Sequence, residues 1–197
     1  MINRYQIIII FSVLILFLKS NFILAQNLSV EKSIFNVQTG VLGLWINNET
    51  KLTNTIVIRT EFGLDGGVLG GEVNKNVGFF LAPVLNVEAR WYYNIKSRDR
   101  NSKNVLNNSA NFITPAISYH PDWFIISKEN SFKVYNQISI IPKWGIRRNI
   151  AKTNFNFEAG IGIGYRYYFK KQDGYIKNDG ETALDLHFRI GYTFKKI

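Results

Sequence analysis

The stretch Asn154–Phe169, NFNFEAGIGIGYRYYF, decides between the fold classes because its side chains alternate with a period of two. One set is apolar from Phe155 to Phe169, while the other set holds Glu158, Arg166 and three glycines. Successive side chains of a β-strand point to opposite faces, whereas the faces of a helix repeat about every 3.6 residues. The stretch therefore predicts a strand with one apolar face and one polar face.

The same alternation recurs along the chain, and helix signals are weak throughout. Gly78–Ile95 repeats it, and Leu184–Phe194, LDLHFRIGYTF, sets apolar residues against Asp185, His187 and Arg189. The other runs are Phe35–Ile46, Thr55–Asp65, Phe112–Ile126 and Phe132–Arg147. The polar connections between runs are 47–54, 96–109, 127–131, 148–153 and 170–181. An all-β fold is the prediction.

Strand length and aromatic content favour a membrane barrel over a soluble sandwich. The runs hold 11 to 18 residues, against about 5 or 6 in an ordinary strand and about 9 to 11 in a tilted transmembrane strand. Aromatic residues crowd the ends of the runs, as in RWYYN (90–94) and YRYYF (165–169), and resemble the girdles of membrane barrels. A sheet in lipid must close on itself, because every backbone group needs a partner. The prediction is a closed antiparallel transmembrane β-barrel.

The number of strands is expected to be eight, since barrels of this class have an even number and seven runs are visible. A turn at His120–Asp122 within 110–127 would supply the eighth strand. A short strand near Leu28–Ile34 is the other candidate. The unbroken apolar phase from Ile113 to Ile125 favours one long strand over the split.

The first 25 residues have the form of a signal peptide. The apolar run Ile7–Leu18 is too short for a spanning helix of about 20 residues, but it has the length of a signal-peptide core. Cleavage is expected after Ala25, and Lys19 argues against a retained anchor. The predicted organisation is a leader at 1–25 and the barrel at 26–197.

The chain is basic, with 24 Lys and Arg against 14 Asp and Glu and a formal net charge of +10. In an exported protein this charge favours lipid head groups and lipopolysaccharide phosphates as partners over nucleic acid. The chain has no cysteine, which excludes disulfides, a thiol nucleophile and thiolate metal sites. Its two histidines show no metal-ligand spacing. We expect a monomer without cofactor or metal.

Several phrases carry a resemblance to known proteins. LNVEARWYYNIKSR (85–98), IIPKWGIRRNI (140–150), GIGIGYRYYF (160–169) and the aromatic Phe194 near the end resemble small Gram-negative outer-membrane β-barrels of OmpA/OmpX size. The resemblance covers about residues 34–197. It implies a location in the bacterial outer membrane and assembly by the barrel-assembly machinery, and it implies no activity.

The polar faces of the runs predict what fills the barrel. An eight-stranded barrel is just wide enough inside to be filled by side chains, and charges buried there must be paired. We therefore expect a lumen network of salt bridges and no pore. Its predicted members are Arg59, Glu61, Glu88, Arg90, Glu158, Arg166, Asp185, His187 and Arg189.

Three functional hypotheses remain open. The leading one is a structural or surface-interaction role with no catalytic residues. The second is a membrane-embedded lipid-modifying enzyme, in which Asp185 and His187, or Ser118 and His120, share a strand face about 7 Å apart. A nucleophilic triad would also need a serine at the same height, and no Gly-x-Ser-x-Gly motif occurs. The third is a soluble lipocalin-like barrel, which requires the apolar faces to point inward.

Overall fold

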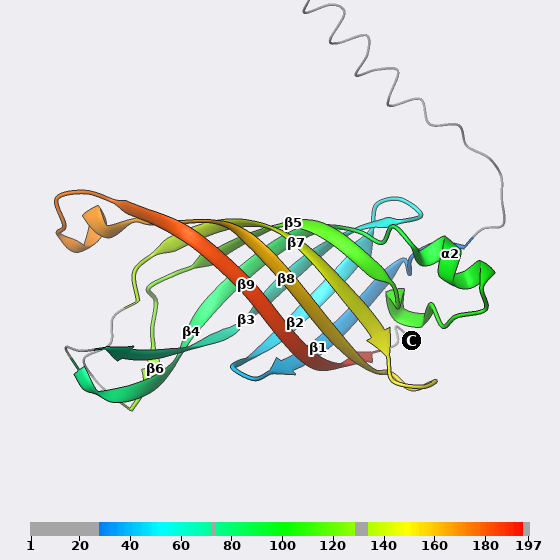
Figure 1. Ribbon diagram of the computed structural model, residues 1–197, viewed down its shortest axis with the longest axis horizontal. Coiled ribbons are helices and arrows are strands. Elements are labelled where there is room, and N and C mark those ends of the chain that lie inside the picture. The colour runs from blue at the N-terminus through cyan, green and yellow to red at the C-terminus, as the bar shows by residue number, and fades with distance from the viewer. Residues whose placement is uncertain (1–27, 72–73, 129–133, 195–197) are drawn as a thin grey trace, which may run out of the picture.

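The computed structural model describes residues 28–71, 74–128 and 134–194, so the predicted leader lies outside the described residues. The described chain forms one sheet of nine antiparallel strands (Figure 1). The strands are β1 (Ser33–Gly40), β2 (Gly43–Lys51), β3 (Ile56–Gly71), β4 (Asn74–Trp91), β5 (Asn111–His120), β6 (Ile126–Ser127), β7 (Gln137–Asn149), β8 (Phe155–Tyr168) and β9 (Asp179–Phe194). The short helices are α2 (Ile95–Arg100), η1 (Leu106–Asn108) and η2 (Lys170–Asp173). Among these residues, no helix has the length and apolar character needed to cross a membrane.

Eight of the strands form a closed ring. The pairs around it are β1–β2, β2–β3, β3–β4, β4–β5, β5–β7, β7–β8, β8–β9 and β9–β1. The first and last strands close the ring, with Phe35 opposite Phe194. The ninth strand, β6, is a two-residue addition in which Ile126 lies opposite Leu81 of β4. The predicted all-β antiparallel fold and its eight ring strands are confirmed.

The eighth ring strand lies where neither candidate placed it. The run Phe35–Ile46 was predicted as one strand but holds two, β1 and β2, which are joined by a turn at Val41–Leu42. Gly43 follows this turn with φ of +145°, a conformation that favours glycine. Residues 28–32 lead into β1 and form no strand of their own. The turn escaped prediction because two apolar residues form it.

The prediction of one long strand over Phe112–Ile126 is also wrong. Strand β5 ends at His120, and the chain leaves the ladder at Pro121. Pro121, the first residue after the strand, has no N–H to donate to a neighbouring strand. The predicted connections 47–54, 148–153 and 170–181 are too long, because β2 continues to Lys51, β7 continues to Asn149 and β9 begins at Asp179.

The ring has charged side chains inside and apolar side chains outside. The largest fully buried side chains include Arg59, Arg90 and Arg147. On the outer surface Leu184 is 65% exposed and Leu186 77% exposed. This polarity is the opposite of the one that a soluble barrel with an apolar interior requires.

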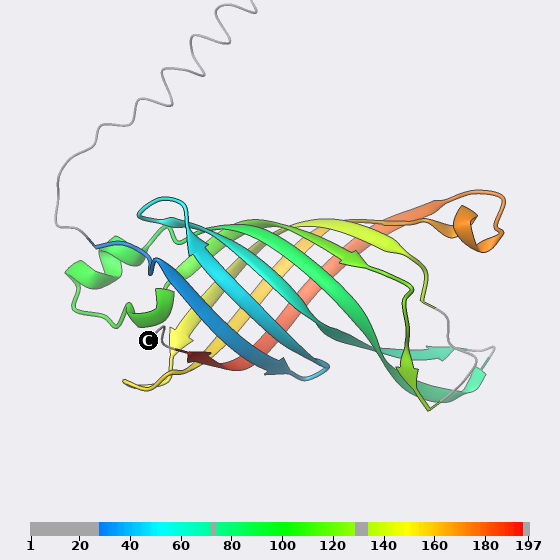
Figure 2. The same ribbon diagram turned by 180° about the vertical axis from the view of Figure 1, so that it is seen from behind.

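An apolar cluster covers one end of the ring. Its buried members are Val30, Val57, Tyr92, Ile95, Ala110 and Phe112. The segment between β4 and β5, which contains α2 and η1, supplies half of them and lies at this end (Figure 1). At the other end the β3–β4 and β8–β9 hairpins project beyond the short β1–β2 hairpin (Figure 2). We call the first end the capped end and the second the mouth.

Candidate functional site: an ionic network and a polar pocket

Glu158 is the centre of the charges inside the ring. One of its carboxylate oxygens accepts a hydrogen bond from Nη1 of Arg59 at 3.2 Å, and the two oxygens accept bonds from Nη1 and Nη2 of Arg90 at 2.8 and 2.7 Å. The pairing register also places Glu158 opposite Arg147 of β7 and Arg189 of β9. Guanidinium groups from four strands therefore lie near Glu158, and two of them donate hydrogen bonds to its carboxylate.

Glu61 is a second node on the side of β3. It pairs with Arg59 two residues earlier on the same strand, and its two oxygens accept bonds from Nη1 of Arg189 at 2.9 and 2.8 Å. The amide of Asn86 donates a further bond at 2.7 Å. The guanidinium of Arg189 also stacks on the ring of Trp45, 3.8 Å from its centroid. These contacts hold the cation between β2, β3 and β9.

A chain of alternating charges joins Glu88 to the histidine of β9. Glu88 accepts bonds from Nε of Arg90 at 2.5 Å and from Nζ of Lys143 at 3.1 Å. Lys143 also lies 3.4 Å from Asp185, whose other oxygen is 2.6 Å from Nδ1 of His187. The Asp185–His187 pair is thus one end of a larger network.

Glu49 belongs to this network although sequence reasoning placed it in a connection. It lies 3.2 Å from Nη1 of Arg147 and 3.4 Å from Nη1 of Arg90. It also accepts a bond from the hydroxyl of Tyr92 at 3.0 Å and one from the amide of Asn108 at 2.8 Å. Since Asn108 belongs to the segment between β4 and β5, this carboxylate ties the network to the capped end.

Among the described residues, the carboxylates of the ionic network equal its Lys and Arg side chains in number. Its acids are Glu49, Glu61, Glu88, Glu158 and Asp185, and its bases are Arg59, Arg90, Lys143, Arg147 and Arg189. Sequence reasoning also omitted Lys143 and Arg147, although both stood on the polar face of the run Phe132–Arg147. Charges this deeply buried need partners, and five acids facing five bases satisfy that need without a bound counter-ion.

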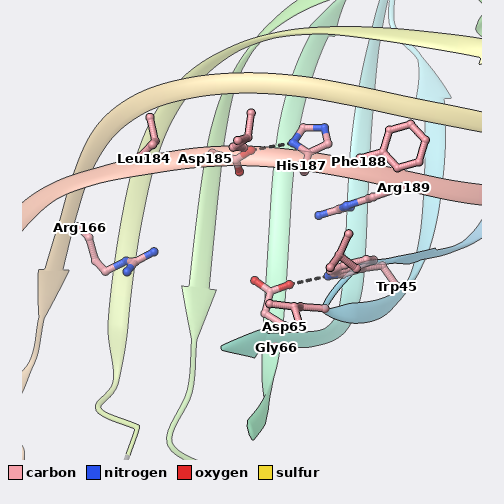
Figure 3. Close-up of a pocket in the computed structure, with 12 residues that line it drawn as sticks. Trp45, Asp65, Gly66, Arg166, Leu184, Asp185, His187, Phe188 and Arg189 are labelled. Carbon is pink, nitrogen blue, oxygen red and sulfur yellow. Dashed lines mark hydrogen bonds and ion pairs between the residues drawn. The ribbon is translucent and has the colours of Figure 1, made fainter. Parts of the chain in front are cut away.

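Arg166 lies apart from the ionic network although it was predicted with it. Its Nη1 is 3.6 Å from Glu181, and its side chain is 31% exposed. It lines a pocket of about 310 Å³ between the network and the mouth (Figure 3). On β9 this pocket reaches Asp185, His187 and Arg189.

Asp65 and Trp45 line the same pocket from β3 and β2 (Figure 3). One oxygen of Asp65 accepts a bond from Nε1 of Trp45 at 2.6 Å, and the other is 2.8 Å from Nε2 of His120. Ser118, the sequence partner proposed for His120, instead lies opposite Asn86 and Ser139 in the sheet. Both histidines therefore pair with aspartates at the edge of the pocket.

The geometry assembles no nucleophilic triad from the described residues. Nε2 of His187 has no hydrogen-bond partner there and lies 3.7 Å from Glu158. Nδ1 of His120 also has no partner in the same part of the chain. A serine-based mechanism needs a hydroxyl on the free imidazole nitrogen, and the described residues supply one to neither histidine. Within 28–71, 74–128 and 134–194, no group of three His, Asp or Glu residues is placed to hold a metal ion.

Comparison of the chain with protein-family models, with curated proteins and with solved structures found no match. The arrangement of the side chains therefore carries the functional conclusion.

Proposed function

We propose that the chain is a small outer-membrane β-barrel with a filled interior and a structural or surface-interaction role. The reversed polarity of the ring carries this proposal. Glu158 and Arg59 are fully buried inside, whereas Leu186 points outward and is 77% exposed. Soluble monomers rarely expose apolar patches larger than a few hundred Å². An outer surface that is apolar on every side of the ring is suited to hydrocarbon.

The height of the apolar band supports a membrane setting. On β8 the outward side chains run from Phe155 through Ile161 to Tyr165, with aromatic residues at both ends. The ten residue steps from Phe155 to Tyr165 span about 33 Å along the strand. A tilt of about 40° reduces this to about 25 Å, the height of the apolar band of outer-membrane barrels. The neighbouring strand β9 carries matching aromatics in Tyr192 and Phe194.

The interior supports a role other than conduction. The ionic network crosses the ring from β2 and β3 to β8 and β9, and its Glu49 is tied to the capped end. A large channel would need more strands than eight. The partners that fit are outer-membrane lipids and lipopolysaccharide around the wall, with the barrel-assembly machinery needed during insertion. We propose a monomer, because the ring closes within one chain.

Membrane fractionation with heat-modifiable gel mobility tests the proposal. We expect the protein in the outer-membrane fraction, extractable only with detergent. We also expect it to migrate faster in SDS before boiling than after, because a closed ring in detergent stays compact until it is heated. A protein that remains in the aqueous fraction without detergent would contradict the proposal.

A further inference from the structure

On one side of the ring, the strands β1 and β2 end earlier toward the mouth than their neighbours β9 and β3. Pairing between β1 and β9 stops at Gly40 opposite Arg189, and pairing between β2 and β3 stops at Gly43 opposite Asp65. Beyond that level, within the described part of the chain, residues Asp179–Phe188 of β9 pair with β8 alone. We call the space above the β1–β2 turn, between β9 and β3, the side notch; Figure 2 shows the short hairpin beside its longer neighbours.

The side notch lies within the proposed apolar band. Leu184, Leu186 and Phe188 project outward beside it and are more than half exposed. An unpaired strand edge is unfavourable against hydrocarbon, because its N–H and C=O groups find no partners there. Such an edge is tolerated where it lines a polar cavity, and the pocket beneath Asp185 and His187 is such a cavity.

Two cavities of opposite character meet at this notch. Inside is the polar pocket of about 310 Å³, and outside is a groove of about 610 Å³ lined by apolar residues such as Trp144 and Ile161. Both cavities are lined by Val41, Leu186, His187 and Phe188. Their volumes lie in the range of small-molecule sites, about 300 to 1,000 Å³. A ligand that filled both would have one polar end and one apolar end.

The hydrogen-bonding groups of the pocket indicate the charge of the polar end. Both oxygens of Asp65 and both oxygens of Asp185 already have donors. The Nε groups of Arg166 and Arg189 have no partner among the described residues. Nε2 of His187, which also lines the pocket, has no partner among them either. The remaining capacity therefore lies in this imidazole nitrogen and in the guanidinium groups, and guanidinium donors bind phosphate oxygens with charge-assisted bonds.

We propose that the side notch binds one membrane lipid sideways, with an acyl chain in the outer groove and its phosphate head group at Arg166 in the pocket. This inference rests on the proposed membrane location. Arg166 is suited to the role because it is partly exposed, whereas Arg189 is already held by Glu61. The free edge of β9 would then be covered by the lipid.

Native mass spectrometry of the protein in dodecyl maltoside micelles tests this inference. The probes are dimyristoyl phosphatidic acid and dimyristoyl phosphatidylcholine, with glycerol 3-phosphate as a competitor. We expect one phosphatidic acid per chain and at least tenfold weaker binding in Arg166→Gln. Val41→Trp should also weaken binding, because Val41 lines both cavities and, at 85% exposure, tolerates a larger side chain. Arg100→Gln, on the exposed surface of α2, is the matched control and should bind as the natural chain does.

Equal binding by Arg166→Gln and Arg100→Gln would overturn the head-group assignment. Glycerol 3-phosphate carries no acyl chain. If it displaced phosphatidic acid when present at the same concentration, the acyl chain would have no role in binding. If the protein formed a dimer without bound lipid, a second copy of the chain would cover the free edge of β9, and the lipid assignment would be wrong. If the natural chain shows heat-modifiable mobility but binds no phosphatidic acid, only this inference fails. If it lacks that mobility, the proposed function fails.

Discussion

Replacing Glu158 by Gln removes the charge at the centre of the ionic network while keeping the size of the side chain. The carboxylate accepts one bond from Arg59 and two from Arg90. A neutral amide keeps one acceptor oxygen and presents an NH₂ group to the other guanidinium, so at least one bond is lost. The balance of five acids and five bases also becomes an excess of one buried positive charge.

The expected loss is about 3 to 5 kcal/mol of unfolding free energy, the usual effect of removing one partner from a buried ion pair. Hydrogen bonds to charged groups contribute about 1.5 to 3 kcal/mol each, so loss of one or two bonds gives the same size of effect. Against a total stability of about 5 to 15 kcal/mol, the variant should still fold at low denaturant concentration.

Urea titration of the protein in lipid vesicles, followed by tryptophan fluorescence and gel mobility, measures this loss. The matched control is Glu181→Gln, whose side chain is 54% exposed and whose carboxylate lies 3.6 Å from Arg166. Its stability should change by no more than about 0.5 kcal/mol. The double variant Glu158→Gln with Arg90→Gln should lose less stability than the sum of the two single variants, because each substitution removes the charge that the other leaves unpaired. A loss below about 1 kcal/mol for Glu158→Gln would refute the inference that this carboxylate organises the interior.

Three further changes test the wall, the interior and the chemistry. Ile161→Lys places a charge near the middle of the outward apolar band and should lower the unfolding free energy in vesicles by about 2 to 4 kcal/mol. Ile176→Lys, at a connection residue that is 97% exposed, should insert and unfold as the wild-type protein does. Equal behaviour of the two variants would argue against lipid contact. In planar bilayers the natural chain should give no large, stable channels, because charged side chains fill its interior, and steady large conductance would contradict that packing. Cells carrying His120→Ala and His187→Ala should keep the lipid A and phospholipid composition of wild-type cells, since neither imidazole has a nucleophile partner among the described residues. If deletion of the protein changes that composition and the variants show the same change, the enzyme hypothesis is restored.

The strands that touch the outer surface along their whole length were the easiest to predict. The alternation at 154–169 anticipated β8 (Phe155–Tyr168) to within one residue at each end. A strand between an apolar surface and a charged interior cannot shift its phase by one residue without turning every side chain to the wrong side. The alternation with a period of two is therefore a reliable signal wherever one face meets the apolar surface and the other the charged interior. It fails at Val41–Leu42, where the turn residues are apolar and so resemble a continuation of the strand.

The contacts inside the ring could be anticipated as a class but not as pairs. Arg59 and Glu158 are 99 residues apart, and their contact depends on how the sheet closes. Alternation shows that both point to the polar face, but it does not give their heights relative to one another. Glu49 was missed for a different reason, since a polar run of residues hid the end of β2. The pocket at the mouth depends on the unequal heights of neighbouring hairpins, and no single strand carries that information.

The asymmetry of the interior limits what the ring of strands can do. At the capped end, buried apolar residues such as Tyr92 and Phe112 lie directly against the ionic network, with the guanidinium of Arg90 4.1 Å from the centre of the Phe112 ring. At the mouth the network is bordered by a pocket that reaches His187. A molecule can therefore approach the charges from the mouth or through the side notch, but it meets a packed, ion-paired layer before it reaches the far end. Such a geometry suits holding a ligand at one level of the ring better than passing one through it.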